Sequence, residues 1–399
     1  MAQPPVVTAE MARSHRLRAH HLAAPLPPGA YCEAAAACGL QNSPPGAFET
    51  ALFARVQGAS PAGIRRALYE EKSLRQAWSL RGAPYVFPTE EAGVFLSPLA
   101  ARPGEEPWIY TRGITAALDY LGMDFDELLP IVMDAARLLE GREVRSKEEL
   151  DRVLAAEAEG TLPPEKLPLW RAGTMYGDPE KQSVGGAVVS FMLRPCAFAG
   201  RVVFGERRGA EPGFTSPLRW LGREIPAVEG AEAELVRRFL HCYAPATWRE
   251  LMDWLGSSPA QARRLWEAVE PELEPVSFAG RRAYVLAGDL DAMRGAEPGD
   301  RLLLLGPHDP YLDARDRETI APDVRVQRKI WKYVGNPGVV LKGGQAAGLW
   351  RGRVSGGSIT VSAELFEPLS DAQKRLLAEL AERQAAARAL KLRRFELKE

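Results

Sequence analysis

Segments with helical hydrophobic spacing alternate with short strand-like runs along most of the chain. The first part contains four segments of helical spacing: residues 9–21, 29–37, 47–56 and 62–71. Ser60-Pro61 opens the last of these, because serine caps a helix and proline suits its first turn. Two alternating runs, 74–80 and 83–87, then flank Arg81-Gly82 and predict a β-hairpin. Helices followed by a two-stranded hairpin are typical of a winged helix.

The same order of elements recurs twice more. In the second unit, helices are expected at 125–140 and 146–159, the latter capped by Ser146 with Glu149 completing a capping box. Apolar runs at 184–193 and 200–204 then supply its strands. The third unit has the clearest pattern, with helices at 231–242, 248–255 and 259–269 and strands at 276–278 and 283–286. The repetition is one of form and not of sequence.

The pattern changes from residue 301 onward. Short glycine-punctuated strands at 302–305, 338–342, 346–351 and 358–361 favour a small barrel or curled sheet, and a helix capped by Ser370 follows at 371–390. We therefore predict an α+β fold with three tandem winged-helix units, a C-terminal β-barrel-like domain and a terminal helix. The predicted domains are 1–117, 118–225, 226–298, 299–369 and 370–399.

Charge is uneven along a chain of 399 residues with a formal net charge of −1. Residues 1–88 hold nine Lys/Arg against five Asp/Glu (+4), residues 119–170 hold six against thirteen (−7), and residues 301–353 hold ten against five (+5). The basic ends suit a polyanion, although random variation of surface charge explains the same numbers. The balance argues against nucleic-acid coating through bulk charge alone.

The four cysteines, at positions 32, 38, 196 and 242, show neither CxxC spacing nor the cysteine–histidine pattern of a zinc site. The sequence therefore predicts no metal site, no cofactor and no disulfide framework, which fits a reducing cytoplasm. No apolar run approaches the length of a membrane span, and the first fifteen residues lack a signal peptide's apolar stretch. We expect a cytoplasmic monomer without membrane contact.

One set of motifs resembles a known family. The segments concerned are 38–43 leading into 52–56, then 73–82, 308–311, 315–317, and 339–341 before 348–351. Together they resemble the winged-helix DNA glycosylases of AlkZ and YcaQ type, which act in alkylpurine and crosslink repair. The resemblance runs from the first helix to about residue 367. It implies three winged helices, a C-terminal β-barrel, and double-stranded DNA with an alkylated or crosslinked base as the partner.

The resemblance also implies catalytic residues. Family members carry Gln-x-Gln or Gln-x-Asp in the loop where this chain has Gln41-Asn42-Ser43, and often a histidine where it has Tyr85. Alkylation at N7 or N3 makes a purine a good leaving group, so a neutral amide that orients water suffices. Gln41 fills that role, and Ser43 accepts one hydrogen bond from the same water with a shorter reach. Glu49 is the nearest carboxylate for a base.

Several further residues are candidates for DNA contact. Six residues have side chains that suit contacts with phosphates or a DNA groove. They are Arg81 in the hairpin turn, Arg75 and Tyr85 on the hairpin strands, Asn42 in the loop, and the adjacent pair Arg65 and Arg66. Simpler roles remain open: a loop-capping amide for Gln41, surface arginines elsewhere, helix-end packing for His20 and His21, and an Asp309–Arg315 ion pair. The predicted function is a monofunctional glycosylase of alkylated purines; the alternative is a non-catalytic regulatory or architectural DNA-binding protein.

Overall fold

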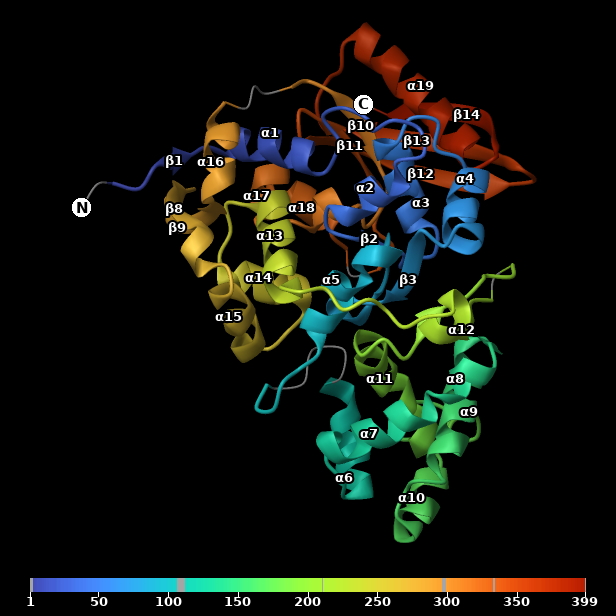
Figure 1. Ribbon diagram of the computed structural model, residues 1–399. Coiled ribbons are helices and arrows are strands. Elements are labelled where there is room, and N and C mark those ends of the chain that lie inside the picture. The colour runs from blue at the N-terminus through green and yellow to red at the C-terminus, as the bar shows by residue number, and fades with distance from the viewer. Residues whose placement is uncertain (1–2, 106–111, 210, 296–298, 333, 399) are drawn as a thin grey trace. The chain divides into compact units, whose positions relative to one another are not determined.

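The computed structural model describes residues 3–105, 112–209, 211–295, 299–332 and 334–398. These residues pack into two compact units that interleave along the chain (Figure 1). Unit 1 comprises the described residues of Met1–Glu71, Ala233–Leu251 and Trp266–Glu399, and unit 2 comprises those of Lys72–Glu232 and Met252–Leu265. The predicted division into five domains stays a prediction, and its boundary at 298 lies outside the described residues.

The N-terminal part of unit 1 is helical, as predicted. Its helices are α1 (Ala9–Ala19), α2 (Tyr31–Ala36), α3 (Ala47–Arg55) and α4 (Pro61–Arg65), with a π-helical turn at Arg66–Glu70 and a two-residue strand β2 (Leu40–Gln41) before α3. The side-chain oxygen of Ser60 accepts a hydrogen bond from Gly63 N at 3.1 Å, which confirms it as the cap of α4.

A hairpin forms where the third repeat predicts one. Strands β8 (Leu273–Phe278) and β9 (Arg281–Leu286) pair antiparallel, and β1 (Val6–Val7) adds a parallel strand beside β8. Three helices precede the hairpin in the chain: α13 (Ala231–Tyr243), α14 (Trp248–Leu255) and α15 (Pro259–Glu267). Helix α16 (Ala287–Arg294) follows it. The strand–turn–strand prediction for 276–286 is confirmed.

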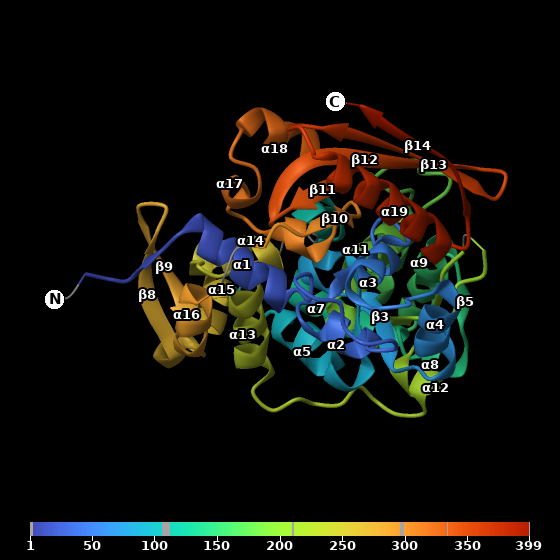
Figure 2. The same cartoon turned by 90° about the horizontal axis from the view of Figure 1, so that it is seen from above.

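The C-terminal part of unit 1 is an open sheet, not a closed barrel. Five strands lie in the order β10 (Leu302–Leu305), β11 (Gly338–Lys342), β12 (Gln345–Ser355), β13 (Ser358–Leu365) and β14 (Lys391–Lys398), so β10 and β14 are edges among the described residues. Helices α17 (Arg317–Ile320) and α18 (Val324–Ile330) lie in the β10–β11 connection. Helix α19 (Asp371–Ala387), capped by Ser370 as predicted, lies across one face of the sheet (Figure 2).

The end of the chain corrects the prediction of a terminal helix over 370–399. The helix ends at Ala387, and Lys391–Lys398 forms β14, which pairs parallel with β13. A register shift between Ile359 and Thr360 of β13 skips Arg393, so both Leu392 and Phe395 lie against the core that α19 shares with the sheet, while Arg393 and Arg394 are exposed. The segment pairs with the edge of β13 because the new strand forms hydrogen bonds with the backbone N–H and C=O groups of that edge. The end of a helix would leave its own last carbonyl groups bonded only to water.

Unit 2 is built around one long buried helix, α11 (Val184–Phe198). The prediction of strand-like runs at 184–193 is wrong: most residues of this segment are buried, and a fully buried helix cannot be told from a strand by periodicity. The other helices of unit 2 are α5 (Ala92–Leu96), α6 (Thr115–Leu121), α7 (Phe125–Ala135), α8 (Leu138–Gly141), α9 (Lys147–Ala158), α10 (Leu167–Arg171) and α12 (Pro217–Leu221).

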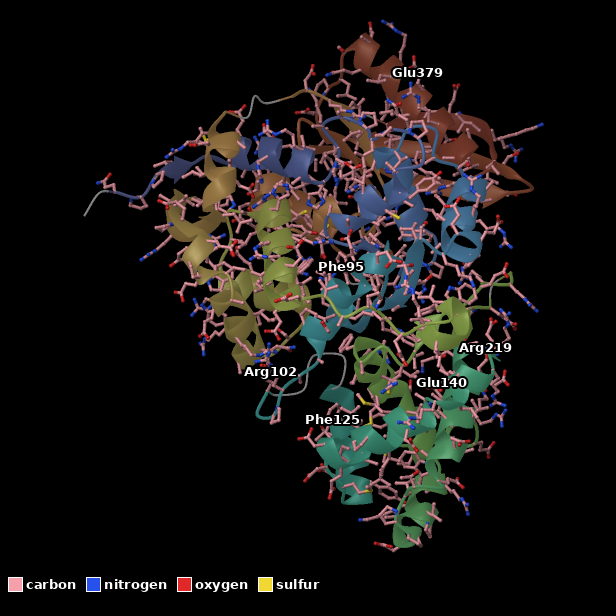
Figure 3. The ribbon with its side chains drawn as sticks, viewed as in Figure 1. Phe95, Arg102, Phe125, Glu140, Arg219 and Glu379 are labelled. Carbon is pink, nitrogen blue, oxygen red and sulfur yellow. The ribbon has the colours of Figure 1, made fainter. Side chains whose placement is uncertain are left out.

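Short strands complete unit 2. Strands β3 (Leu74–Trp78) and β4 (Pro84–Pro88) form the predicted hairpin around Arg81-Gly82, and β5 (Val144–Arg145), β7 (Gly213–Thr215) and β6 (Val203–Phe204) form a small antiparallel sheet. Arg219 of α12 donates to Gly141 O at 3.1 Å, and its side chain is labelled near Glu140 of α8 in Figure 3. No described helix has the length and apolar character that crossing a membrane requires.

Candidate active site

The loop after β2 is shaped by its own side chains. Asn42 Oδ1 accepts a hydrogen bond from Gly46 N at 2.7 Å, and Gln41 Nε2 donates to Ser43 O at 3.0 Å. The Ser43–Pro44 peptide bond is cis, and Gly46 adopts φ 92°, which glycine tolerates best, directly before α3. Gln41 is half-buried and Ser43 is exposed. The loop therefore presents Gln41 in one orientation, with Asn42 acting as a turn residue.

Gln41 lines a small recess together with residues more than 260 positions later in the sequence. The recess has a volume of about 40 Å³, and its walls include His308, Asp313, Trp331 and Asn336. Because one water occupies roughly 30 Å³ of liquid, the recess has room for a water and is far too small for a purine. His308 adopts a left-handed backbone with φ 60°, which is uncommon for a residue with a Cβ atom. A nucleobase next to Gln41 must lie outside this recess.

A buried ion pair holds the later wall of the recess against α3. Arg55 Nη1 and Nη2 donate to the two Asp309 carboxylate oxygens at 2.8 Å each, and Asp309 Oδ1 also accepts from Tyr311 N at 3.0 Å. Burial alone lowers the pKa of Arg55, but the charge and hydrogen bonds of Asp309 outweigh it and raise that pKa. The predicted Asp309–Arg315 ion pair is wrong, because Arg315 instead faces Asp313 at 3.3 Å.

A second buried arginine fixes the end of the same segment. Arg16 of α1 donates to Asp316 Oδ1 at 3.0 Å, to Ala244 O at 3.0 Å and to Tyr243 O at 2.7 Å. The charged groups at both ends of the segment 309–316 are therefore paired inside unit 1. Such fully satisfied buried pairs specify one arrangement, since breaking either leaves a charge without compensation.

Of the carboxylates near Gln41, Asp313 is the one placed for proton transfer. Both Asp309 and Asp313 line the recess. Asp313 is half-buried and accepts a hydrogen bond from Arg315 Nη2 at 3.3 Å, whereas Asp309 is 1% exposed and both of its oxygens bind Arg55. Glu49 lies on the first turn of α3 and is absent from the walls of the recess. A carboxylate and an amide facing a water-sized space are the groups that general-base hydrolysis requires.

Comparison with known proteins decides the family. A family model described as DNA glycosylase AlkZ-like matches residues 34–387. The chain belongs to the AlkZ-like DNA glycosylase family. An interstrand DNA cross-link repair glycosylase of Streptomyces sahachiroi is 27% identical over 327 residues, which cover 78% of this chain and 79% of that relative. The solved structure of the DNA glycosylase AlkZ of the same organism has a TM-score of 0.76 and 20% identity, covering 98% of this chain and all of that one.

Family membership confirms the predicted resemblance and the assignment as a DNA glycosylase. The structural likeness supports the α+β fold alone. The recess residues in this AlkZ-like chain were missed by sequence reasoning, although the segment containing His308 had been singled out for its resemblance. The segment containing His308 is far from Gln41 along the chain, so the sequence does not predict that the two meet. Neither Trp331 nor Asn336 belongs to a motif that would predict a place in the recess.

Two of the three DNA-contact candidates on the β3–β4 hairpin are buried. Arg75 is 2% exposed and Tyr85 is 3% exposed, so neither side chain is on the surface where the prediction places it. Arg81, at φ 53° in the turn, is half-buried and donates to Trp254 O at 2.8 Å and to Tyr85 Oη at 2.9 Å. In this conformation these three residues support the hairpin.

Other arginines of this glycosylase-family chain do reach the surface. Arg65 and Arg66 are exposed; the first lies over the Tyr69 ring, and the second pairs with Glu71 at 2.9 Å. Sequence reasoning missed a further exposed pair, Arg351 and Arg353, two residues apart on β12 and therefore on one face of the sheet. Residues two apart on a strand point to the same face, so a predicted strand continued from 346–351 to Arg353 would place Arg351 and Arg353 side by side.

Proposed function

We propose that this protein is a monofunctional DNA glycosylase that hydrolyses the N-glycosidic bond of an alkylated purine, with no metal ion or cofactor taking part in the reaction. The observation that carries the proposal is the position of Gln41, held by its own loop at a water-sized recess that also contains Asp313. Membership of a DNA glycosylase family supports the reaction class.

The protein does not need to protonate the leaving base, because the alkylated purine is already cationic. Gln41 orients the attacking water, and the Asp313 carboxylate accepts its proton as the glycosidic bond breaks and the sugar acquires oxocarbenium character. The alkylated purine leaves as a neutral base, and water oxygen becomes the sugar hydroxyl. Ser43, exposed beside Gln41, accepts a hydrogen bond from the same water network.

The proposed DNA-binding surface includes the polar face of the β12–β13 hairpin. Arg353 lies opposite Thr360, which in turn lies opposite Arg394 on β14, so these residues form a row across three strands. The opposite face packs on α19, so only this polar face is available to a phosphate backbone. We further propose that three winged-helix units, as the sequence pattern predicts, bind duplex DNA and that the protein acts as a monomer.

The lesion is proposed from the relative and the site together. The Streptomyces relative is named for the repair of interstrand crosslinks. A crosslink joins bases of both strands, so a crosslinked base cannot rotate fully out of the duplex into a closed pocket. The small volume of the recess at Gln41 agrees with a target base that stays outside it. We therefore expect activity on bulky N7-alkylated purines and on crosslinks as well as on 7-methylguanine.

The test is base release from duplex DNA that contains 7-methylguanine, followed by alkaline cleavage of the abasic site. Gln41→Ala should reduce the single-turnover rate by about 10²-fold or more, as loss of an orienting group does. Binding to undamaged duplex should be retained, because affinity depends mainly on phosphate contacts. Gln57→Ala is the matched control, since Gln57 is an exposed glutamine of the same unit.

Two further variants separate the roles around the recess. Asp313→Asn should reduce base release by about 10²- to 10⁴-fold at neutral pH, because the amide cannot accept the proton. Ser43→Gln should preserve or raise activity, since it restores the motif of characterised relatives. Equal losses of melting temperature, binding and activity in Gln41→Ala would show that Gln41 is a structural cap.

The alternative function is a non-catalytic DNA-binding protein that keeps the scaffold. Its sequence basis is Ser43, where characterised relatives have glutamine or aspartate. A wild-type protein that binds duplex DNA in a salt-dependent manner and releases no alkylated base from any of the three substrates would establish this alternative.

A further inference from the structure

Three sulfur and nitrogen groups from distant parts of unit 1 meet in its interior. His20 follows α1, Cys38 follows α2, and Cys242 lies within α13. One possible ligand atom from each residue lies within 4.8 Å of the other two. The residues are 1%, 2% and 0% exposed. No sequence motif predicts this cluster, because its members are 18 and 204 positions apart along the chain.

The orientation of His20 is the one found in metal-binding histidines. Its Nε2 lies 3.1 Å from Cys242 O, and since a carbonyl oxygen only accepts hydrogen bonds, Nε2 carries the proton. The lone pair of Nδ1 therefore points toward Cys38 Sγ, 3.8 Å away. A histidine whose second nitrogen donates to a backbone carbonyl is held in the tautomer and the ring orientation that a metal ion needs.

We propose that His20, Cys38 and Cys242 bind one thiophilic d¹⁰ cation, Zn²⁺ or Cu(I), as a structural site. Bond lengths of about 2.3 Å to sulfur and 2.0 Å to nitrogen place tetrahedral zinc ligands roughly 3.6–3.8 Å apart, so the observed spacing requires only small side-chain adjustments. Thiolate and imidazole ligands select these cations over magnesium or calcium. Zn²⁺ with two thiolates is neutral, which suits a site without solvent.

The sulfur atoms of the cluster have polar neighbours. His20 Nδ1 and the Tyr243 hydroxyl oxygen lie 3.8 Å and 3.6 Å from Cys38 Sγ, and Ala37 O lies 3.5 Å from Cys242 Sγ. Thiols that merely pack as small apolar groups do not require this set of polar neighbours.

The site would brace both sides of the recess at Gln41. Cys38 precedes Gln41 by three residues, and the Tyr243 hydroxyl donates to Pro310 O at 2.9 Å in the segment that forms the opposite wall. A bound cation would fix the loop and this segment to α13. This consequence rests on the proposed function, but cation binding itself does not.

The experiment uses the full chain purified without chelator or histidine tag. Elemental analysis should find about one equivalent of zinc or copper, as expected for a site coupled to folding. Chelator-treated protein should take up Zn²⁺ or, with reductant under anaerobic conditions, Cu(I), and its melting temperature should rise. Replacement by Co²⁺ should produce a sulfur-to-cobalt charge-transfer band. These readouts do not depend on glycosylase activity, so failure of the proposed function would leave them unchanged.

Variants locate the site. Cys38→Ser and Cys242→Ser should lose the charge-transfer band, and His20→Asn should weaken binding by at least 10-fold. Cys32→Ser and Cys196→Ser are the matched controls outside the cluster and should bind as the wild type does. Should a cluster variant fail to fold, the wild-type titration decides alone. The proposal is overturned if the wild type binds no more than Cys38→Ser, or if mass spectrometry finds a Cys38–Cys242 disulfide in protein that takes up no cation.

Discussion

Arg55 in unit 1 and Arg75 in unit 2 are buried to almost the same extent, but their surroundings are opposite. Arg55 is 1% exposed and its guanidinium meets both oxygens of Asp309, whereas Arg75 is 2% exposed and none of its three side-chain nitrogens has a hydrogen-bond partner among the described residues. Burial, then the charge of Arg223, lower the pKa of Arg75 to about 10. Asp309 raises that of Arg55.

The two regions are stabilised by different interactions. Around Arg55 the buried charges are compensated, so the ion pair fixes one geometry for the wall that faces Gln41. Around Arg75 the guanidinium has lost its hydration without gaining a hydrogen-bonded carboxylate, and the charge of Glu90 offsets only part of this cost in the folded state. Aromatic packing between Trp78, Phe204 and Phe214, with ring centroids 4.7–5.4 Å apart, contributes stability in that region instead.

The sharpest test of this comparison is Arg55→Met. Removal of the arginine leaves Asp309 as an unpaired buried charge, so the free energy of unfolding should fall by about 3–5 kcal/mol in urea titrations. Base release should fall as well, because the wall at the recess loses its anchor. The double variant Arg55→Met/Asp309→Leu should recover much of the stability. A loss below about 1 kcal/mol in the single variant would contradict the role given to this pair.

The second prediction concerns pH and the histidines of unit 1. Burial, opposed by Asp289, lowers the pKa of His15 from 6.5 to about 4. Because the unfolded chain then binds more protons below pH 6.5, stability is lost as pH falls through that range toward 4. From pH 7 to pH 5 the loss should be about 2 kcal/mol. His15→Gln should reduce this slope in urea titrations.

A neighbouring histidine provides the control with opposite sign. The hydrogen bond to Asp289, at 2.9 Å, raises the pKa of His241, so its contribution is present at low pH and is lost as pH rises through the folded-state value. His241→Asn should therefore steepen the acid loss that His15 causes. An unchanged pH profile in both variants would contradict the assignment.

The third prediction is that Arg75→Met leaves stability unchanged or raises it by up to about 1 kcal/mol, since it replaces a desolvated, unpartnered cation with an apolar side chain of similar length. Comparison with Arg55→Met in the same urea titrations tests the contrast directly. A loss above about 2 kcal/mol would show that Arg75 has a compensating partner in solution and would break the comparison.

The smallest effect on stability is expected from the exposed arginines. Arg65→Ala and Arg66→Ala should each change the free energy of unfolding by less than about 0.5 kcal/mol. If they contact phosphates, each should also reduce the slope of log affinity against log salt by about 1. Arg137→Ala is the matched control, an exposed arginine of unit 2 that pairs with Asp134 at 3.4 Å. Equal slopes in all three variants would remove the pair from the DNA-binding surface.

Sequence alone determined the features that depend on neighbouring residues. The serine caps at positions 60, 146 and 370 form as predicted, because a serine oxygen needs only the backbone three residues ahead. The capping box predicted at Ser146 is half formed: Ser146 accepts from Glu149 N, but the described residues show no return bond from the Glu149 side chain. The hairpins at 74–88 and 273–286 follow from alternation around a turn. The motif resemblance found the family before any contact was known.

The contacts between distant segments depend on tertiary packing and could not be predicted from local sequence. The apolar run Val184–Phe198 is a helix because it is buried on most sides, where periodicity does not distinguish helix from strand. Lys391–Lys398 is a strand because it pairs with the edge of β13, which overrides its local helical pattern. Tertiary packing also paired Arg55 with Asp309, and it placed Asp313 beside Gln41 and Cys242 beside Cys38. Spacing along the chain carries no signal for such contacts, because they depend on how whole elements pack.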